Sequence, residues 1–152
     1  MLEAQTLIEI MVEEKALVLR LIAANLKDRA GIVNSDTSLL AESLKDKEEV
    51  KAALEMLEMK RVALTGDRSL REIMQAVEQE VQSKLVALQA DLKVSAREVQ
   101  ALSKANILLF KQSLALKEQL QRGIFGAKGQ SYNGSGQLAG TPSAGNYVSS
   151  SA

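Results

Sequence analysis

The chain of 152 residues contains no cysteine and no histidine. Without thiols it forms neither disulfides nor thiolate metal sites, and without imidazole it lacks the usual general base of enzymes. There is one proline and there are four aromatic residues, of which Phe110 is the first along the chain. The apolar content is therefore Leu, Ala, Val, Ile and Met, a composition typical of long helices. We expect an all-α protein that is not an enzyme and has no cofactor and no metal site.

Charge of either sign is not in excess, because nineteen Lys and Arg balance nineteen Asp and Glu. This balance argues against a nucleic-acid partner or an anionic membrane surface. Long hydrophobic runs are missing too, since the most apolar stretch, 16–24, is short and interrupted by Arg20. Four glutamates among the first fifteen residues do not fit a targeting peptide. We expect a cytoplasmic protein without membrane insertion.

Glycine is scarce in most of the chain and concentrated near its end. Only Gly31 and Gly66 precede residue 123, whereas seven glycines and the single proline follow, with Lys128 as the one charged residue of that segment. A segment of this composition buries too little apolar area to offset its ordering entropy. We therefore predict a helical body over 1–122 and a flexible tail over 123–152. The roles of Phe125 and Tyr147 in this tail stay open.

The first part of the body predicts a helical hairpin. A wide apolar face with spacings of three and four predicts a helix over about 2–29, which Gly31 would end as a C-cap. A second stripe lies beside the main one on this helix and consists of Ile8, Val12, Leu19, Ile22 and Leu26. The N-cap residues of segment 34–38 predict the start of a second helix over about 36–64.

A third helix is predicted over 69–122, a stretch with no glycine or proline. Ser69 and Glu72 match a capping box at its start. Apolar residues then alternate spacings of four and three, the pattern of a coiled-coil seam. The seam consists of Val81, Leu85, Leu88, Leu92, Ser95, Val99, Leu102, Asn106, Leu109, Ser113, Leu116 and Leu120. The predicted fold is an antiparallel hairpin packed on this long third helix.

Helix lengths leave part of the seam without a partner. The hairpin helices would be roughly 42 Å long and the third helix roughly 80 Å, so the seam from Ser95 to Leu120 would be uncovered. Three resolutions are open: the third helix breaks near 93–95 and folds back, two copies pair, or another protein's helix occupies the seam.

The layout resembles the FlgN family of flagellar export chaperones. The resemblance covers most of the chain. It rests on motifs in three segments, which follow one another in the order expected for the family. The second helix carries Leu39-Leu40 and Lys60-Arg61, and the third carries Asn106-Ile107-Leu108-Leu109 and Ser113-Leu114. The tail carries Ser131-Tyr132-Asn133-Gly134-Ser135-Gly136, which is similar to the family's Tyr-x-x-x-Gly signature.

This resemblance implies a function and names the residues that perform it. Family members bind hook-associated (hook-filament junction) proteins in the cytoplasm, prevent premature assembly and deliver them to the flagellar type III export apparatus. The client's amphipathic C-terminal helix would bind the vacant seam, at Val99, Leu102, Asn106, Leu109, Ser113, Leu116 and Leu120. Tyr132, with Gly136, would dock on the cytoplasmic domain of the export gate. Tyr132 is expected ten residues beyond the end of the third helix, on a flexible link.

Two other functions compete with this hypothesis. A self-associating coiled coil would act as a structural tether or adaptor with no export role, and a homodimer is possible under either reading. A membrane-surface helix is disfavoured by the zero net charge and acidic flanks. The sequence leaves the client's identity, the resting oligomer and the straightness of the third helix open.

Overall fold

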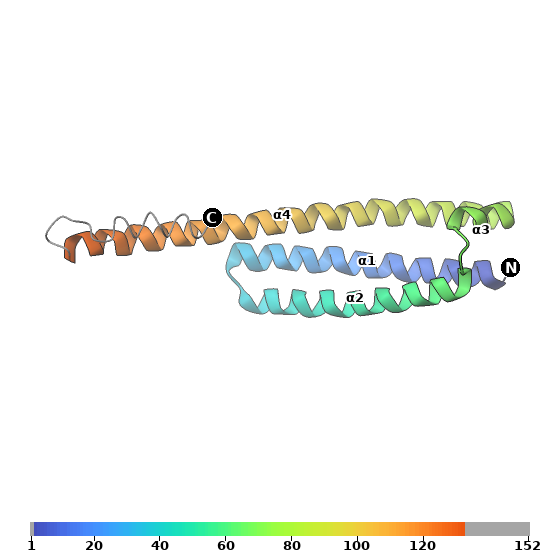
Figure 1. The fold of residues 1–152 in the computed structure, drawn as a ribbon, viewed down its shortest axis with the longest axis horizontal. Coiled ribbons are helices and arrows are strands. Elements are labelled where there is room, and N and C mark those ends of the chain that lie inside the picture. Colours follow the sequence, from blue (N-terminus) through green and yellow to red (C-terminus); the bar gives the residue numbers. More distant parts are fainter. Residues whose placement is uncertain (1, 133–152) are drawn as a thin grey trace. The chain divides into compact units, whose positions relative to one another are not determined.

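The computed structural model describes residues 2–132, and in them the chain is helical. Four helices follow one another: α1 (Leu2–Asn34), α2 (Thr37–Thr65), α3 (Leu70–Ala76) and α4 (Gln79–Tyr132). The described residues up to Ile107 form one compact unit, and the described residues from Leu108 onward form another. The predicted all-α fold, a hairpin packed on a long helix, is confirmed (Figure 1). None of the described helices is apolar over a stretch long enough to cross a bilayer.

α1 and α2 form the antiparallel hairpin, and the turn between them differs from the prediction. α1 continues through Gly31 to Asn34, and the reversal is made by Ser35 with a φ of 52°. Gly31 serves packing instead, because a Cβ at this position would lie 2.9 Å from the side chain of Leu40. Asp36 caps α2 as the sequence suggested, accepting hydrogen bonds from the backbone N–H groups of Ser38 and Leu39.

The expected third helix is divided into two. The capping box of Ser69 and Glu72 is present, but the short α3 ends at Ala76 and Val77 is extended. The buried side chain of Ile73 joins the same core cluster as Leu85, together with Leu7 and Met11 of α1. In one straight helix Ile73 and Leu85 would be about 18 Å apart and could not share these neighbours. Packing therefore breaks the helix at a place where the sequence has no glycine or proline.

This break changes which part of the seam is covered within the chain. Ser95 and Asn106 are buried, so the prediction that the seam lacks a partner from Ser95 onward is wrong for these residues. Two differences explain the result: α1 is 33 residues long instead of 28, and α4 begins ten residues later than the predicted helix. At 1.5 Å per residue, α1 is about 50 Å long and α4 needs about 43 Å to reach Ile107.

Ion pairs line both contacts that α1 makes. On the α2 side, Lys47 pairs with Asp28 and Lys27 with Asp46, the latter at 2.9 Å. The Ser43 hydroxyl, fully buried, donates to the carbonyl oxygen of Ala24 at 2.9 Å, so the two helices lie close together at this level. On the α4 side, Lys15 pairs with Asp91 at 2.9 Å.

At its other end α4 continues through three glycines to Tyr132. The predicted helix end at residue 122 is therefore passed by ten residues, and Tyr132 is the last residue of α4 instead of lying on a link. The division into a body over 1–122 and a tail over 123–152 stays a prediction. Gly136 and Tyr147 lie outside the described residues.

Candidate functional site

The predicted client-binding residues fall into two groups, one in each compact unit. Val99 and Leu102 are half-buried and Asn106 is 5% exposed, all in the unit that ends at Ile107. Leu109 and Ser113 are half-buried in the second unit, whereas Leu116 and Leu120 are 56% and 58% exposed. Within the described chain, the later residues of the seam are the ones most open to a partner.

Asn106 is held by α1 rather than presented to solvent. Its side-chain Nδ2 donates to the carbonyl oxygen of Asn25 at 2.8 Å. The Asn25 side chain, also buried, donates in turn to the carbonyl oxygen of Leu21 at 2.9 Å. Neither Oδ1 atom accepts a hydrogen bond from a protein group. A buried acceptor without a donor costs about 1–3 kcal/mol, so this amide pair is a weak point in the packing of α4 on α1.

The second unit carries a broader apolar face than the seam alone. Phe110 and Leu114 are half-exposed, and each follows a seam residue directly, so they form a second column beside the first. Residues four apart lie on the same side of a helix, which places Phe110 above Leu114 and Leu116 above Leu120. We call the surface formed by these four residues the late α4 face. An aromatic anchor beside aliphatic residues is typical of the energetically dominant part of a protein interface.

Charged residues around the late α4 face are mostly basic. Between residues 108 and 123 the charges are Lys111, Lys117, Glu118 and Arg122. The two lysines are exposed, while Glu118 and Arg122 are half-buried. A helix that packs on this face would be favoured by acidic residues along its edges.

The sequence pattern alone did not single out the second column of the late α4 face. Phe110 and Leu114 have helical spacing, but they lie outside the single column of residues that the seven-residue repeat defines. Nor did the pattern show that Asn25 would meet Asn106. Both asparagines lie in apolar stripes, a placement that could have suggested a buried polar contact between the two helices.

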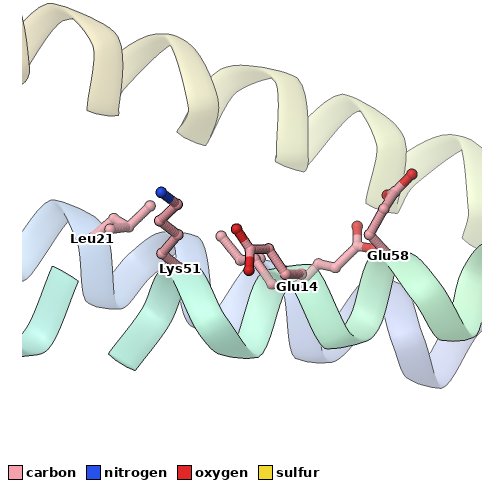
Figure 2. A pocket seen from close by; sticks show the side chains of 6 residues that line it. Glu14, Leu21, Lys51 and Glu58 are labelled. Atoms are coloured by element: carbon pink, nitrogen blue, oxygen red, sulfur yellow. The ribbon is translucent and has the colours of Figure 1, made fainter. Parts of the chain in front are cut away.

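A separate hollow lies between α1 and α2. It is shallow, with a volume of about 430 Å³, and is lined by Glu14 and Leu21 of α1 and by Lys51, Leu54, Glu55 and Glu58 of α2. Figure 2 shows these side chains along the groove and labels four of them. Among the described residues, no cluster of three or more acidic side chains is placed to hold a metal ion.

Glu14 is the electrostatically unusual residue of this hollow. Burial raises the pKa of its carboxyl group, and the Glu58 carboxylate acts in the same direction. The guanidinium of Arg61, at 3.9 Å, partly offsets this rise in pKa. Arg61 also donates to Glu58, so the three side chains form one ionic cluster that joins α1 to α2. This cluster therefore has a structural role, because it holds the two helices of the hairpin together.

Comparison with known proteins gives one match. A family model described as FlgN protein matches residues 1–140. No curated protein and no solved structure matches the chain. The matched range includes all four helices, the late α4 face, Tyr132 and Gly136.

Proposed function

The chain belongs to the FlgN family of flagellar export chaperones, and from this premise we propose that it binds hook-associated (hook-filament junction) proteins in the cytoplasm. In this proposal it prevents their premature assembly and delivers them to the flagellar type III export apparatus. No cofactor and no catalytic residue takes part, because holding and releasing a client requires only reversible binding.

The observation that carries the proposal is the late α4 face. Its four large apolar side chains are about half exposed or more and lie in two columns with Ser113 and Lys117 between them. This clustering favours a binding site over scattered surface residues. An amphipathic helix from the C-terminal part of the client would lay its apolar side on this face. The surrounding lysines would pair with acidic residues at the edges of that helix. Val99, Leu102, Asn106, Leu109 and Ser113 remain proposed contacts, and Asn106 would first have to leave Asn25.

Delivery would use a different part of α4. We assign docking on the cytoplasmic domain of the export gate to Tyr132, with Gly136 following it in sequence. Along the helix axis Tyr132 is about 18 Å from Leu120, so a client helix can end before it reaches the tyrosine. The two contacts are therefore separable by mutation.

The first test concerns the client. Leu116→Asp and Leu120→Asp should each weaken binding of the client's C-terminal helix by at least about tenfold, because an unpaired charge in a desolvated interface costs several kcal/mol. Both residues are more than half exposed, so the melting temperature should stay the same. Ala115→Asp is the matched control, since this exposed residue lies on the opposite side of α4. Titration calorimetry with a client peptide measures the effect.

Two outcomes of this experiment would contradict the proposal. Unchanged client affinity in both leucine variants would place the binding site elsewhere. A dimeric wild-type chain that Leu116→Asp converts to a monomer in sedimentation would instead favour the self-associating tether, because the late α4 face would then join two copies.

The second test concerns the gate. Tyr132→Ala should leave client affinity within about 0.5 kcal/mol of the wild type, the usual size for a change outside a binding site. The same variant should lose affinity for the gate's cytoplasmic domain and reduce motility, whereas Tyr147→Ala serves as the comparison. Weaker client binding with normal gate binding would assign the tyrosine to the client site and contradict the delivery model.

A further inference from the structure

α1 carries a second coiled-coil seam that points away from both of its neighbours. Val12, Leu19, Leu26 and Val33 are spaced seven residues apart, and each is between 50% and 63% exposed. Ala16, Ala23 and Ala30 lie between them, so the spacings alternate four and three over three heptads. Two of these alanines are exposed and Ala30 is half-buried. We call these seven positions the α1 outer seam.

The outer seam is distinct from the faces of α1 that are already occupied. The residues that face α2 include Ala24, whose carbonyl oxygen accepts from Ser43, and those that face α4 include Leu7 and Met11. Neither group belongs to the outer seam. Isolated exposed leucines are ordinary, but four large apolar residues on one line about 32 Å long are not scattered.

The alternation of large and small residues limits the shape of what can bind. A partner helix can approach closely above each alanine, and it needs bulky side chains to fill the space there. The outer seam therefore fits an amphipathic helix with large apolar residues, in the knobs-into-holes manner. A flat or polar surface would leave the alanine positions unfilled.

Charges along the two edges of the outer seam are mostly positive. One edge carries Lys15 and Arg29, and the other carries Glu13, Arg20 and Lys27. Three of these side chains form ion pairs with acids of the neighbouring helices. Lys15 pairs with Asp91 of α4 at 2.9 Å. On the α2 side, Arg20 pairs with Glu49 at 3.4 Å and Lys27 pairs with Asp46 at 2.9 Å. Their side chains nevertheless remain 38–50% exposed, so they can also face a partner.

These charges argue against a second copy of the chain as the occupant. In a parallel pair the flanking positions would bring Lys15 beside the other copy's Arg20. In the antiparallel register that brings Lys15 opposite Arg29, Arg20 would meet the other copy's Arg20. Only Glu13 would then meet an opposite charge, on Lys27. Like charges opposite each other disfavour both arrangements, which is a common way of excluding a wrong partner.

We propose that the α1 outer seam is a docking site for an amphipathic helix of another protein, with bulky apolar residues facing the alanines and acidic residues along its edges. This site is separate from the late α4 face and does not depend on the function proposed for it. A chaperone with two such surfaces would hold a client and a second helical protein at the same time.

Two synthetic helical peptides of three heptads test the proposal against the full-length chain. Both have Leu at the seam positions; one has Glu at the flanking positions and the other has Lys. Fluorescence anisotropy should show that the Glu peptide binds at least about tenfold more tightly than the Lys peptide, with a difference that shrinks at high salt. Equal binding of the two peptides would overturn the charge argument and the proposal with it.

Three variants locate the site. Leu19→Asp should weaken the Glu peptide at least about tenfold, whereas Met59→Asp should leave it within about twofold. Met59 is an even more exposed apolar residue of α2, 72% against 50% for Leu19, and lies outside the seam. Ala23→Phe enlarges the apolar surface but blocks close approach, so it should also weaken binding. Circular dichroism melting checks that all three variants are folded. Equal effects of Leu19→Asp and Met59→Asp, or tighter binding by Ala23→Phe, would show nonspecific adhesion and overturn the proposal.

The same variants separate this site from the proposed client site. Leu19→Asp should leave binding of the client peptide unchanged, and Leu116→Asp should leave binding of the Glu peptide unchanged. Loss of client binding in Leu19→Asp would mean that the client itself occupies the outer seam. A dimer that Leu19→Asp dissociates would mean that a second copy occupies it. Either result overturns the inference, and neither depends on the late α4 face being correct.

Discussion

Glu14 shows how a single carboxyl group couples the hairpin to pH. It lies between α1 and α2 beside Arg61 and Glu58, and burial is the main cause of its raised pKa. The folded chain therefore holds this proton to a higher pH than the unfolded chain does. Between the ordinary carboxyl pKa of 4.5 and the raised value, the free energy of unfolding falls as pH increases.

A Glu14→Gln variant should reveal this effect. Glutamine keeps the shape and removes the charge, so we expect a higher melting temperature than wild type at pH 7, reduced by whatever the pair with Arg61 contributes. At pH 4 the wild-type carboxyl group is largely protonated and the two melting curves should coincide. Thermal melts at both pH values measure the difference. A wild type that is more stable than the variant at pH 7 would show that Arg61 outweighs burial.

Residues also differ in how far their surroundings could be predicted from sequence. The caps at Asp36 and Ser69 are predictable from the local sequence. In each cap a side chain binds a backbone N–H group two or three residues away, and no contact with another helix is needed. The burial of Asn106 is not predictable in this way, since it depends on Asn25, a residue of another helix. The late α4 face lies between these cases: its seam column is periodic, but periodicity does not give the exposure of its side chains, which is 48–58%.

At the scale of elements, the turn between α1 and α2 rests on close packing at Gly31. The sequence suggested a helix end there because glycine often occupies that position. In the structure the same glycine is helical and admits Leu40, and the Asp36 carbonyl oxygen would be 3.1 Å from an added Cβ. Glycine is favoured both at a helix end and where two helices pack closely. The residue type alone therefore does not show which of the two applies to Gly31.

We predict that Gly31→Ala destabilises the chain by about 1 kcal/mol, although alanine favours a helix more than glycine does. The cost arises because Leu40 must move away from the new methyl group. Leu40→Ala alone should also destabilise, but in its presence Gly31→Ala should cost clearly less, because only the contact with the Asp36 carbonyl oxygen remains. A double-mutant cycle by urea denaturation measures this coupling. Additive effects of the two substitutions would contradict the packing explanation.

The break between α3 and α4 cannot be predicted from the sequence. Val77 and Glu78 are ordinary residues, and helical periodicity continues across them. The break becomes necessary only when Ile73 and Leu85 must reach the same side chains of α1. A helix end that is set by packing on distant residues has no characteristic residue in the local sequence.

The chain is divided into two compact units, one up to Ile107 and one from Leu108 onward. The core residues Leu7, Met11, Ile73 and Leu85 all belong to the unit that ends at Ile107. A chain truncated after Ile107 should therefore keep a cooperative melt at nearly the wild-type temperature. It should also lose the helical signal of the later part of α4 and most of the proposed client binding.

Circular dichroism melting of the truncated chain, compared with the full chain, tests this prediction. Leu85→Asp is the contrasting variant, because it introduces a charge at a fully buried position and should abolish the cooperative transition. A large loss of melting temperature on truncation would mean that residues beyond Ile107 stabilise the first unit.

The contacts of α1 also bear on the order in which the chain folds. Ser43 meets Ala24 across 19 residues of sequence, whereas Asn106 meets Asn25 across 81. Short separations close with less loss of entropy and therefore form sooner. On a ribosome the hairpin of α1 and α2 can assemble while α4 is still being synthesised. The docking of α4 is then the last step of folding, so the buried contact of Asn106 with Asn25 forms only after the hairpin is complete.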